Sequence, residues 1–257
     1  MSTVEPRSIF VDSLSSCCLK IDAMANSQHL GSATGFVTTH RDRHFLVTNW
    51  HVVSGRHPDT NQARHPSLAV PDSLNIWFHA SIGLGNWVSC NYRLYDDAGR
   101  PQWWEHPSGR AVDVVLIPLE KLDPIVYYGM PLELADTDMV PTPAMPVSII
   151  GFPLGLSTGG LWPIWKTGHI ASDPDLNYDG RPAFLIDATT RGGMSGSPVI
   201  LRLSGGYRTS NGNFMISMSG FQDKLLGIYA GRIHENLEVG RVWRPNLIRD
   251  ILTHHDP

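Results

Sequence analysis

One stretch constrains this chain more than any other. It is a glycine-rich loop, TRGGMSGSP at residues 190–198, that holds a serine and leads directly into the strand-like residues 199–201. Glycine permits backbone conformations that other residues avoid, and it lets the chain approach a bound substrate closely. Such a loop can direct the N–H groups of Gly193 and Ser195 at one point, which is what an oxyanion hole requires. The alternative interpretation is a glycine-rich turn between strands that holds a serine by chance.

Two further stretches supply groups that would activate Ser195. The segment TNWHVV at residues 48–53 holds His51, and the apolar segment AVDVVLIPL at residues 111–119 holds Asp113. A serine hydroxyl is a weak nucleophile until a base takes its proton, and that base is usually a histidine oriented by a buried carboxylate. A structural histidine or a carboxylate at a strand end would explain either residue singly. Their occurrence together with the serine loop favours a catalytic triad.

These motifs resemble those of the chymotrypsin-fold (trypsin-like) serine proteases, nearest to the bacterial branch that includes the HtrA-type proteases. The resemblance covers roughly residue 19 to the end of the chain and rests on four segments: 48–53, 112–115, 193–198 and 227–231. It implies an all-β fold of two six-stranded antiparallel β-barrels with a short C-terminal α-helix. It also implies a serine endopeptidase that forms an acyl-enzyme, with His51, Asp113 and Ser195 as the triad and the N–H groups of Gly193 and Ser195 as the oxyanion hole.

The serine loop departs from the pattern of the secreted digestive enzymes at two positions. Met194 stands where those enzymes carry the aspartate that pairs with a freshly cut N-terminus, and Ser197 replaces a glycine. The resemblance therefore implies that the full-length chain is competent without proteolytic trimming, although a regulatory protein partner could still order its loops.

The resemblance also places a substrate-binding pocket beside the serine. Its walls would be Thr189, Thr190, Tyr229, Ala230, Gly231 and Gly240. None of these is acidic, so a preference for Lys or Arg lacks its counter-charge. Relatives selective for Glu or Gln place a threonine where Thr190 lies and a histidine where this chain has Tyr229. Two preferences remain open: a polar or acidic side chain, with Arg232 or Arg241 nearby, or a small apolar one.

The length and the breaker residues predict how the chain is organised. The 257 residues fit one all-β unit, because such folds often run to about 200–250 residues as a single domain. We expect a single trypsin-like peptidase domain over 1–257, without a PDZ domain. Its parts are an N-terminal barrel over about 17–125, a proline-rich crossing segment over 126–146, a C-terminal barrel over 147–243 and a C-terminal helix over 245–254.

Charge and cysteine content bear on partners and location. The net charge is −4 and the sequence pI about 6.3, which disfavours nucleic acid and anionic membrane surfaces as partners. Three cysteines, two of them adjacent, do not make a disulfide framework, and no apolar leader precedes the domain. We therefore expect a cytoplasmic enzyme that acts on polypeptide substrates and needs no cofactor and no metal.

Three alternatives differ in class. An α/β-hydrolase needs Gly-x-Ser-x-Gly between a strand and a helix, whereas position 197 is serine and Pro198 opens a strand-like run. A zinc enzyme is disfavoured because no His-Glu-x-x-His motif and no paired cysteine spacing occurs. The third alternative is a catalytically silent peptide-binding module on the same fold, which the presence of all three triad residues disfavours.

Overall fold

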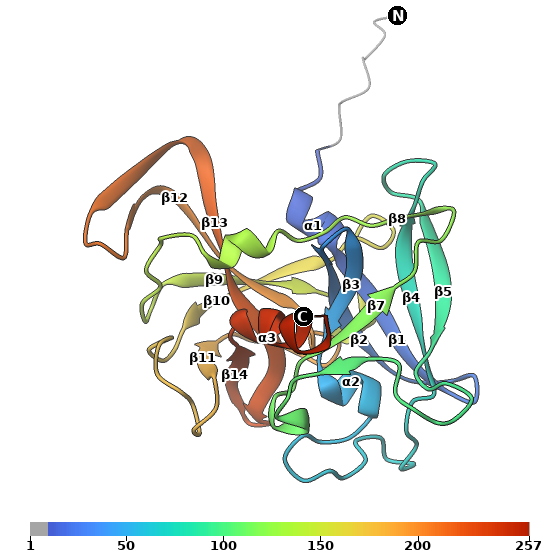
Figure 1. The fold of residues 1–257 in the computed structure, drawn as a ribbon. Helices are drawn as coiled ribbons and strands as arrows, with labels where there is room; N and C mark the ends of the chain where they lie inside the picture. Colours follow the sequence, from blue (N-terminus) through green and yellow to red (C-terminus); the bar gives the residue numbers. More distant parts are fainter. Residues whose placement is uncertain (1–9, 257) are drawn as a thin grey trace, which may run out of the picture.

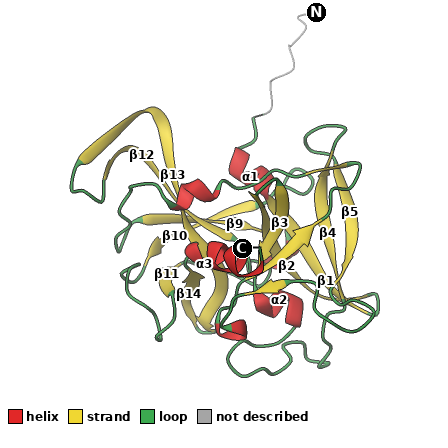
Figure 2. Ribbon diagram, viewed as in Figure 1, coloured by secondary structure: helices red, strands yellow, loops and turns green. Residues whose placement is uncertain are grey.

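The computed structural model of the protein describes residues 10–256, apart from the side chains of residues 217–219. Strands dominate, and the few helices are short (Figure 2). Two groups of antiparallel strands lie side by side, one from each half of the chain (Figure 1). This arrangement confirms the predicted all-β, chymotrypsin-like fold class.

The first half forms one eight-stranded sheet, two strands more than predicted. Its path runs β5-β4-β1-β2-β3-β7-β6, and β8 pairs with β4. The β2–β3 hairpin turns at Arg41 and Asp42, which both have positive φ, as a tight two-residue hairpin turn requires. The strands are β1 (Cys18–Ala25), β2 (Gln28–His40), β3 (Arg43–Thr48), β4 (Ser73–Ala80), β5 (Trp87–Arg93), β6 (Trp104–Glu105), β7 (Val115–Leu119) and β8 (Ile125–Val126).

The second half closes into a six-stranded barrel in the order β10-β11-β14-β13-β12-β9. Its two longest strands, β12 and β13, continue past the barrel as a projecting hairpin (Figure 1). The polar, glycine-rich residues 204–208 belong to this hairpin, and residues 209–213 form its turn. The strands are β9 (Pro146–Gly151), β10 (Ile164–Ile170), β11 (Ala183–Asp187), β12 (Pro198–Arg208), β13 (Phe214–His234) and β14 (Leu237–Trp243).

The helices are α1 (Ser13–Cys17), α2 (Trp50–Ser54) and α3 (Asn246–His255), with 3₁₀ turns η1 (Gly109–Ala111), η2 (Leu132–Ala135) and η3 (Pro153–Gly155). The predicted C-terminal helix is confirmed as α3. No helix within residues 10–256 is long and apolar enough to cross a membrane.

Three clusters of buried side chains hold the fold together. One cluster consists of side chains of the first half of the chain, and one consists of side chains of the second half, inside the barrel. The third contains side chains of both halves and lies between them. The apolar face of α3 contributes Leu247, Ile248, Ile251 and Leu252 to this third cluster, beside side chains of β2, β3 and β7. Burying apolar surface between the halves fixes their relative position, which matters because both halves contribute to the candidate site.

Candidate active site

His51 is placed by a single helical turn that follows β3 directly. This helix, α2, ends at Gly55, whose φ of 63° is left-handed and whose N–H bonds back to the carbonyl of His51. A side chain at Gly55 would collide with Pro71, since a Cβ there would lie 2.3 Å from the proline Cδ. Glycine at this C-terminal position therefore lets the turn stop abruptly and pack against the following loop.

Asp113 meets His51 from the segment between η1 and β7. Its Oδ2 lies 2.7 Å from Nδ1 of His51, and its Oδ1 accepts the backbone N–H of His51 at 2.9 Å. The side-chain amide of Asn49 donates to the Asp113 carbonyl at 2.7 Å. Both Asp113 and His51 are buried. Each carboxylate oxygen thus has a defined donor, which fixes the imidazole ring and leaves Nε2 as its outward-facing nitrogen.

The environment lowers the pKa of His51 below its ordinary value of 6.5. Burial is the main cause, because it disfavours the charged imidazolium. The negative charge of Asp113 opposes this shift, whereas the positive charge of Arg64 reinforces it. The imidazole of His51 is therefore neutral at physiological pH.

The serine loop is held in place by β2 from the other half of the molecule. Thr34 donates two hydrogen bonds to the loop. Its N–H donates to the Ser195 carbonyl at 2.9 Å, and its hydroxyl donates to the Gly193 carbonyl at 2.8 Å. Gly196 lies so close to β2 that a Cβ there would sit 2.0 Å from the Thr34 carbonyl oxygen, and its φ is 87°. Thr34 could not be predicted as a support of the serine loop, because nothing in its local sequence shows that it contacts a loop so distant along the chain.

The backbone of the serine loop presents two N–H groups that have no acceptor in the described part of the chain. The Gly192 carbonyl accepts the N–H of Leu154 at 2.6 Å. The N–H and C=O of a trans peptide point in opposite directions, so the Gly193 N–H points away from Leu154. Within residues 10–256, neither the Gly193 nor the Ser195 N–H bonds to a protein acceptor. Both are therefore available as donors to a bound oxyanion.

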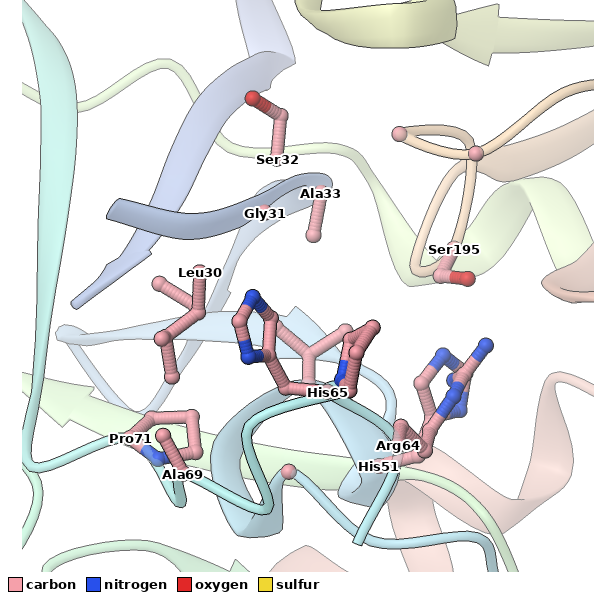
Figure 3. Close-up of a pocket in the computed structure, with 16 residues that line it drawn as sticks. Leu30, Gly31, Ser32, Ala33, His51, Arg64, His65, Ala69, Pro71 and Ser195 are labelled. Carbon is pink, nitrogen blue, oxygen red and sulfur yellow. The ribbon is translucent and has the colours of Figure 1, made fainter. Parts of the chain in front are cut away.

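Ser195 and His51 line the same cavity, whose volume is about 280 Å³ (Figure 3). Residues 30–33 of β2 form one side of this cavity, and Gly192 and Gly193 border it next to the serine. No hydrogen bond joins the Ser195 hydroxyl to His51 in the described part of the chain. Catalytic hydrogen bonds are often long in ligand-free enzymes and tighten when substrate binds.

The residues predicted to line a substrate pocket do not all lie around one pocket in the structure. Thr190 and Tyr229 are each only 1% exposed, and their hydroxyls bond to each other. The Tyr229 ring lies against Gly240, where a Cβ would be 2.3 Å from the ring. Thr189 is exposed, and Ala230 and Gly231 line a second cavity beside His51. Tyr229 thus occupies the space beneath Gly240.

Met194 is fully buried among the side chains of the barrel core. The position where a zymogen of this type would carry its aspartate is therefore apolar and packed. No group of three or more side chains that could hold a metal ion occurs within residues 10–256.

Comparison with known proteins matches residues 33–205 to the model of the trypsin-like peptidase domain. The chain belongs to the trypsin-like peptidase family. No curated protein matches the chain. The matched segment contains the histidine, the aspartate and the serine loop described above, and it ends within β12.

Solved structures share the trypsin-like fold at low sequence identity. A thermostable serine protease, AL20, from an extremophilic microorganism aligns with a TM-score of 0.54 and 11% identity over 95% of this chain and 98% of its own. Protease Anisep from Arthrobacter nicotinovorans aligns with a TM-score of 0.52 and 12% identity over 93% of this chain and 94% of its own. A serine endoprotease from Yersinia pestis aligns with a TM-score of 0.51 and 11% identity over 96% of this chain and 67% of its own. At these identities the comparison supports the fold alone.

Proposed function

We propose that this trypsin-like peptidase is a serine endopeptidase, with Ser195 as nucleophile, His51 as general base and Asp113 as the residue that orients the base. One observation carries the proposal: a buried histidine, hydrogen-bonded to a buried carboxylate at 2.7 Å, shares a cavity with a serine beside two unoccupied N–H donors. These are the groups that acyl transfer to a serine requires.

The proposed reaction proceeds in two halves. Ser195 Oγ attacks the peptide carbonyl as His51 Nε2 takes its proton, and the N–H groups of Gly193 and Ser195 hold the oxyanion. The C–N bond then breaks, and His51 returns the proton to the leaving amine. Water repeats the sequence on the acyl-enzyme and releases the new C-terminus. Throughout, Asp113 keeps the ring proton on Nδ1 and stabilises the imidazolium.

A fluorophosphonate probe tests the proposal directly. We expect covalent labelling of Ser195 in the intact chain, located by mass spectrometry, together with cleavage of an unstructured protein such as casein. A chain that binds peptides but neither takes up the probe nor cleaves would instead support the catalytically silent peptide-binding alternative.

The pH dependence of activity follows from the lowered pKa of His51. The base works only when neutral, and a lowered pKa means that the imidazolium loses its proton at a lower pH. We therefore expect kcat/KM to rise along an acid limb whose midpoint lies below pH 6.5 and to be level at neutral pH. Measuring kcat/KM on one peptide across acidic and neutral buffers checks this. A midpoint above pH 7 would contradict the proposed base and its environment.

The Tyr229 ring, which fills the space beneath Gly240, predicts which substrate residue is preferred immediately before the scissile bond. Because the Tyr229 ring and the Thr190 hydroxyl close this space, we expect a preference for alanine, glycine or serine there. Tyr229→Val should open the pocket and shift the leucine-to-alanine ratio of kcat/KM upward by about tenfold or more, as expected for one or two methylenes in a pocket. Profiling cleavage of a peptide library by each variant measures the shift.

Tyr229→Phe is the matched control, because it keeps the ring and removes only the hydroxyl. Its preference should stay that of the parent chain. If Tyr229→Val, still folded by its thermal transition, also keeps the parent preference, the pocket is not closed by this ring.

A further inference from the structure

A second cavity opens next to His51, separate from the one that holds Ser195. Its volume is about 140 Å³. The loop after α2 forms one wall, β13 and β14 form another, and the His51–Asp113 pair lies at its edge. His51 and Arg64 border both cavities, so a peptide bound across Ser195 would pass close to this one.

The two acidic side chains of the second cavity already have partners. Asp113 bonds to His51, and Asp59 forms an ion pair with Arg181 at 2.5 Å. The charge of Asp59 is therefore neutralised by Arg181, whereas Asp113, bonded to a neutral imidazole, keeps its charge and acts on Arg64. One carboxylate charge thus faces the arginines that also line the cavity.

Among the residues that the structure describes, three arginines line the cavity, and of these only Arg232 is paired. Its guanidinium donates to the Glu235 carbonyl at 2.6 Å and lies 3.5 Å from Glu238. Across residues 10–256, Arg64 and Arg241 have no ion pair with a carboxylate and no side-chain hydrogen bond. A cationic cavity thus remains beside the proposed catalytic residues.

Among the described residues, Arg241 lies against two aromatic rings and has no hydrogen-bond acceptor. Its guanidinium lies over the rings of Tyr178 and Trp243, at 5.6 and 5.9 Å from their centroids. Its Nε is fully buried and has no hydrogen-bond partner. The residue as a whole is only partly buried, so a carboxylate in the cavity would meet the terminal guanidinium nitrogens rather than the buried Nε.

Arg64 brings its charge to the proposed catalytic pair itself. Figure 3 shows its side chain beside His51, below Ser195. The residue reaches the surface, yet nearby atoms partly desolvate its guanidinium, which lowers its pKa, while the charge of Asp113 opposes that shift. The cation therefore lies where an anion on a bound peptide could reach it.

We propose that the second cavity binds an acidic side chain, Asp or Glu, of the polypeptide substrate, with Arg64 and Arg241 as its cationic partners. A guanidinium matches a carboxylate through two parallel hydrogen bonds, which makes arginine suited to this recognition. The proposal rests on the proposed endopeptidase function, because it assigns the cavity to substrate.

The acidic residue belongs on the N-terminal side of the scissile bond. Ala230 and Gly231, which line the second cavity, adjoin Tyr229, which closes the space assigned to the residue immediately before that bond. Consecutive side chains of an extended peptide point to opposite faces. The first residue before the bond faces the serine loop, so the second faces His51 and the cationic cavity.

Binding to the full-length Ser195→Ala chain tests the site without requiring turnover. The probes are two peptides with alanine before the scissile bond that differ only in Glu or Gln at the second position. We expect the Glu peptide to bind about tenfold more tightly at low salt, as one charge-assisted hydrogen bond would give, and the difference to shrink as salt rises. Adding Arg64→Gln should remove most of the difference, and Arg241→Gln should do the same.

Arg93→Gln is the matched control, since it removes the same charge from an exposed arginine paired with Asp97. It should keep the full Glu preference. Arg64 is exposed, so its variant is expected to fold, and a thermal transition checks the more buried Arg241 variant. Equal Kd values for the Glu and Gln peptides on the Ser195→Ala chain would overturn the proposal, as would a Glu preference that survives both arginine substitutions.

Cleavage of the same peptides by the chain with Ser195 intact separates this proposal from the proposed function. If the Glu preference in binding is present but neither peptide is cut, the anion site stands and the endopeptidase assignment falls. If both peptides are cut equally and bound equally, the endopeptidase assignment stands and the anion site falls.

Discussion

Replacing Ser195 with alanine is expected to lower kcat by about 10⁴- to 10⁶-fold while the chain stays folded. The loss follows from removing the nucleophile, after which only the oxyanion donors and substrate binding assist hydrolysis. The fold should persist because the loop is held through its backbone: Thr34 bonds to the carbonyls of Gly193 and Ser195, and Gly196 donates to the Tyr229 carbonyl. Initial rates on a fluorogenic peptide and a thermal transition measure the two effects.

Ser197→Ala provides the matched control within the same loop. Ser197 is fully buried, and its hydroxyl has no hydrogen-bond partner. Removing that hydroxyl leaves no new unpaired group, so activity and thermal transition should stay close to those of the parent chain. Equal cleavage by Ser195→Ala and the parent would end the assignment of Ser195 as nucleophile.

The fold class was predictable because strand signals and the serine motif are both local. The histidine segment 48–53, the apolar run after Asp113 and the serine loop each carry the resemblance to trypsin-like proteases within a few residues of sequence. The arm formed by β12 and β13 beyond the barrel was not predicted. Its residues 204–213 are polar and glycine-rich and lack a core face, so they carry the composition of a loop although strands pair there.

The candidate catalytic residues could be predicted from the sequence, but the residues that hold them in place could not. Asp113 sits in an apolar run and His51 follows a strand, and the structure brings these two within hydrogen-bond distance. Thr34, which holds the serine loop, lies 159 residues from Gly193 along the chain. Only the packing of the two halves makes that contact, so no local pattern could reveal it.

The substrate pocket was the least predictable part, because side-chain packing decides it. The sequence placed Thr190 and Tyr229 near each other but could not show that their hydroxyls bond and exclude solvent. It left acidic and small apolar preferences open for one pocket. Our two proposals assign these preferences to different places: a small side chain to the closed space beneath Gly240, and an acidic one to the cavity lined by Arg64 and Arg241.

Asp113→Asn is expected to lower kcat/KM by about 10⁴-fold, because the amide would hold His51 in the wrong tautomer. One oxygen of Asp113 accepts the backbone N–H of His51, so the carbonyl oxygen of the asparagine must take that place. Its NH₂ group then faces Nδ1, where Oδ2 now accepts the ring proton. The ring can pair with this donor only by carrying its proton on Nε2, and a protonated Nε2 cannot take the proton of Ser195.

Nitrogen NMR of the His51 ring distinguishes this explanation from a simple loss of stability. The parent chain should carry the ring proton on Nδ1, and the Asp113→Asn chain should carry it on Nε2 with its thermal transition largely retained. Asp97→Asn is the control, since Asp97 is an exposed partner of Arg93 and surface ion pairs contribute little. If Asp113→Asn moved the proton to Nε2 yet kept parental kcat/KM, His51 would not be the base. If it unfolded the chain, the loss of activity would come from instability, and the explanation by a changed tautomer would be wrong.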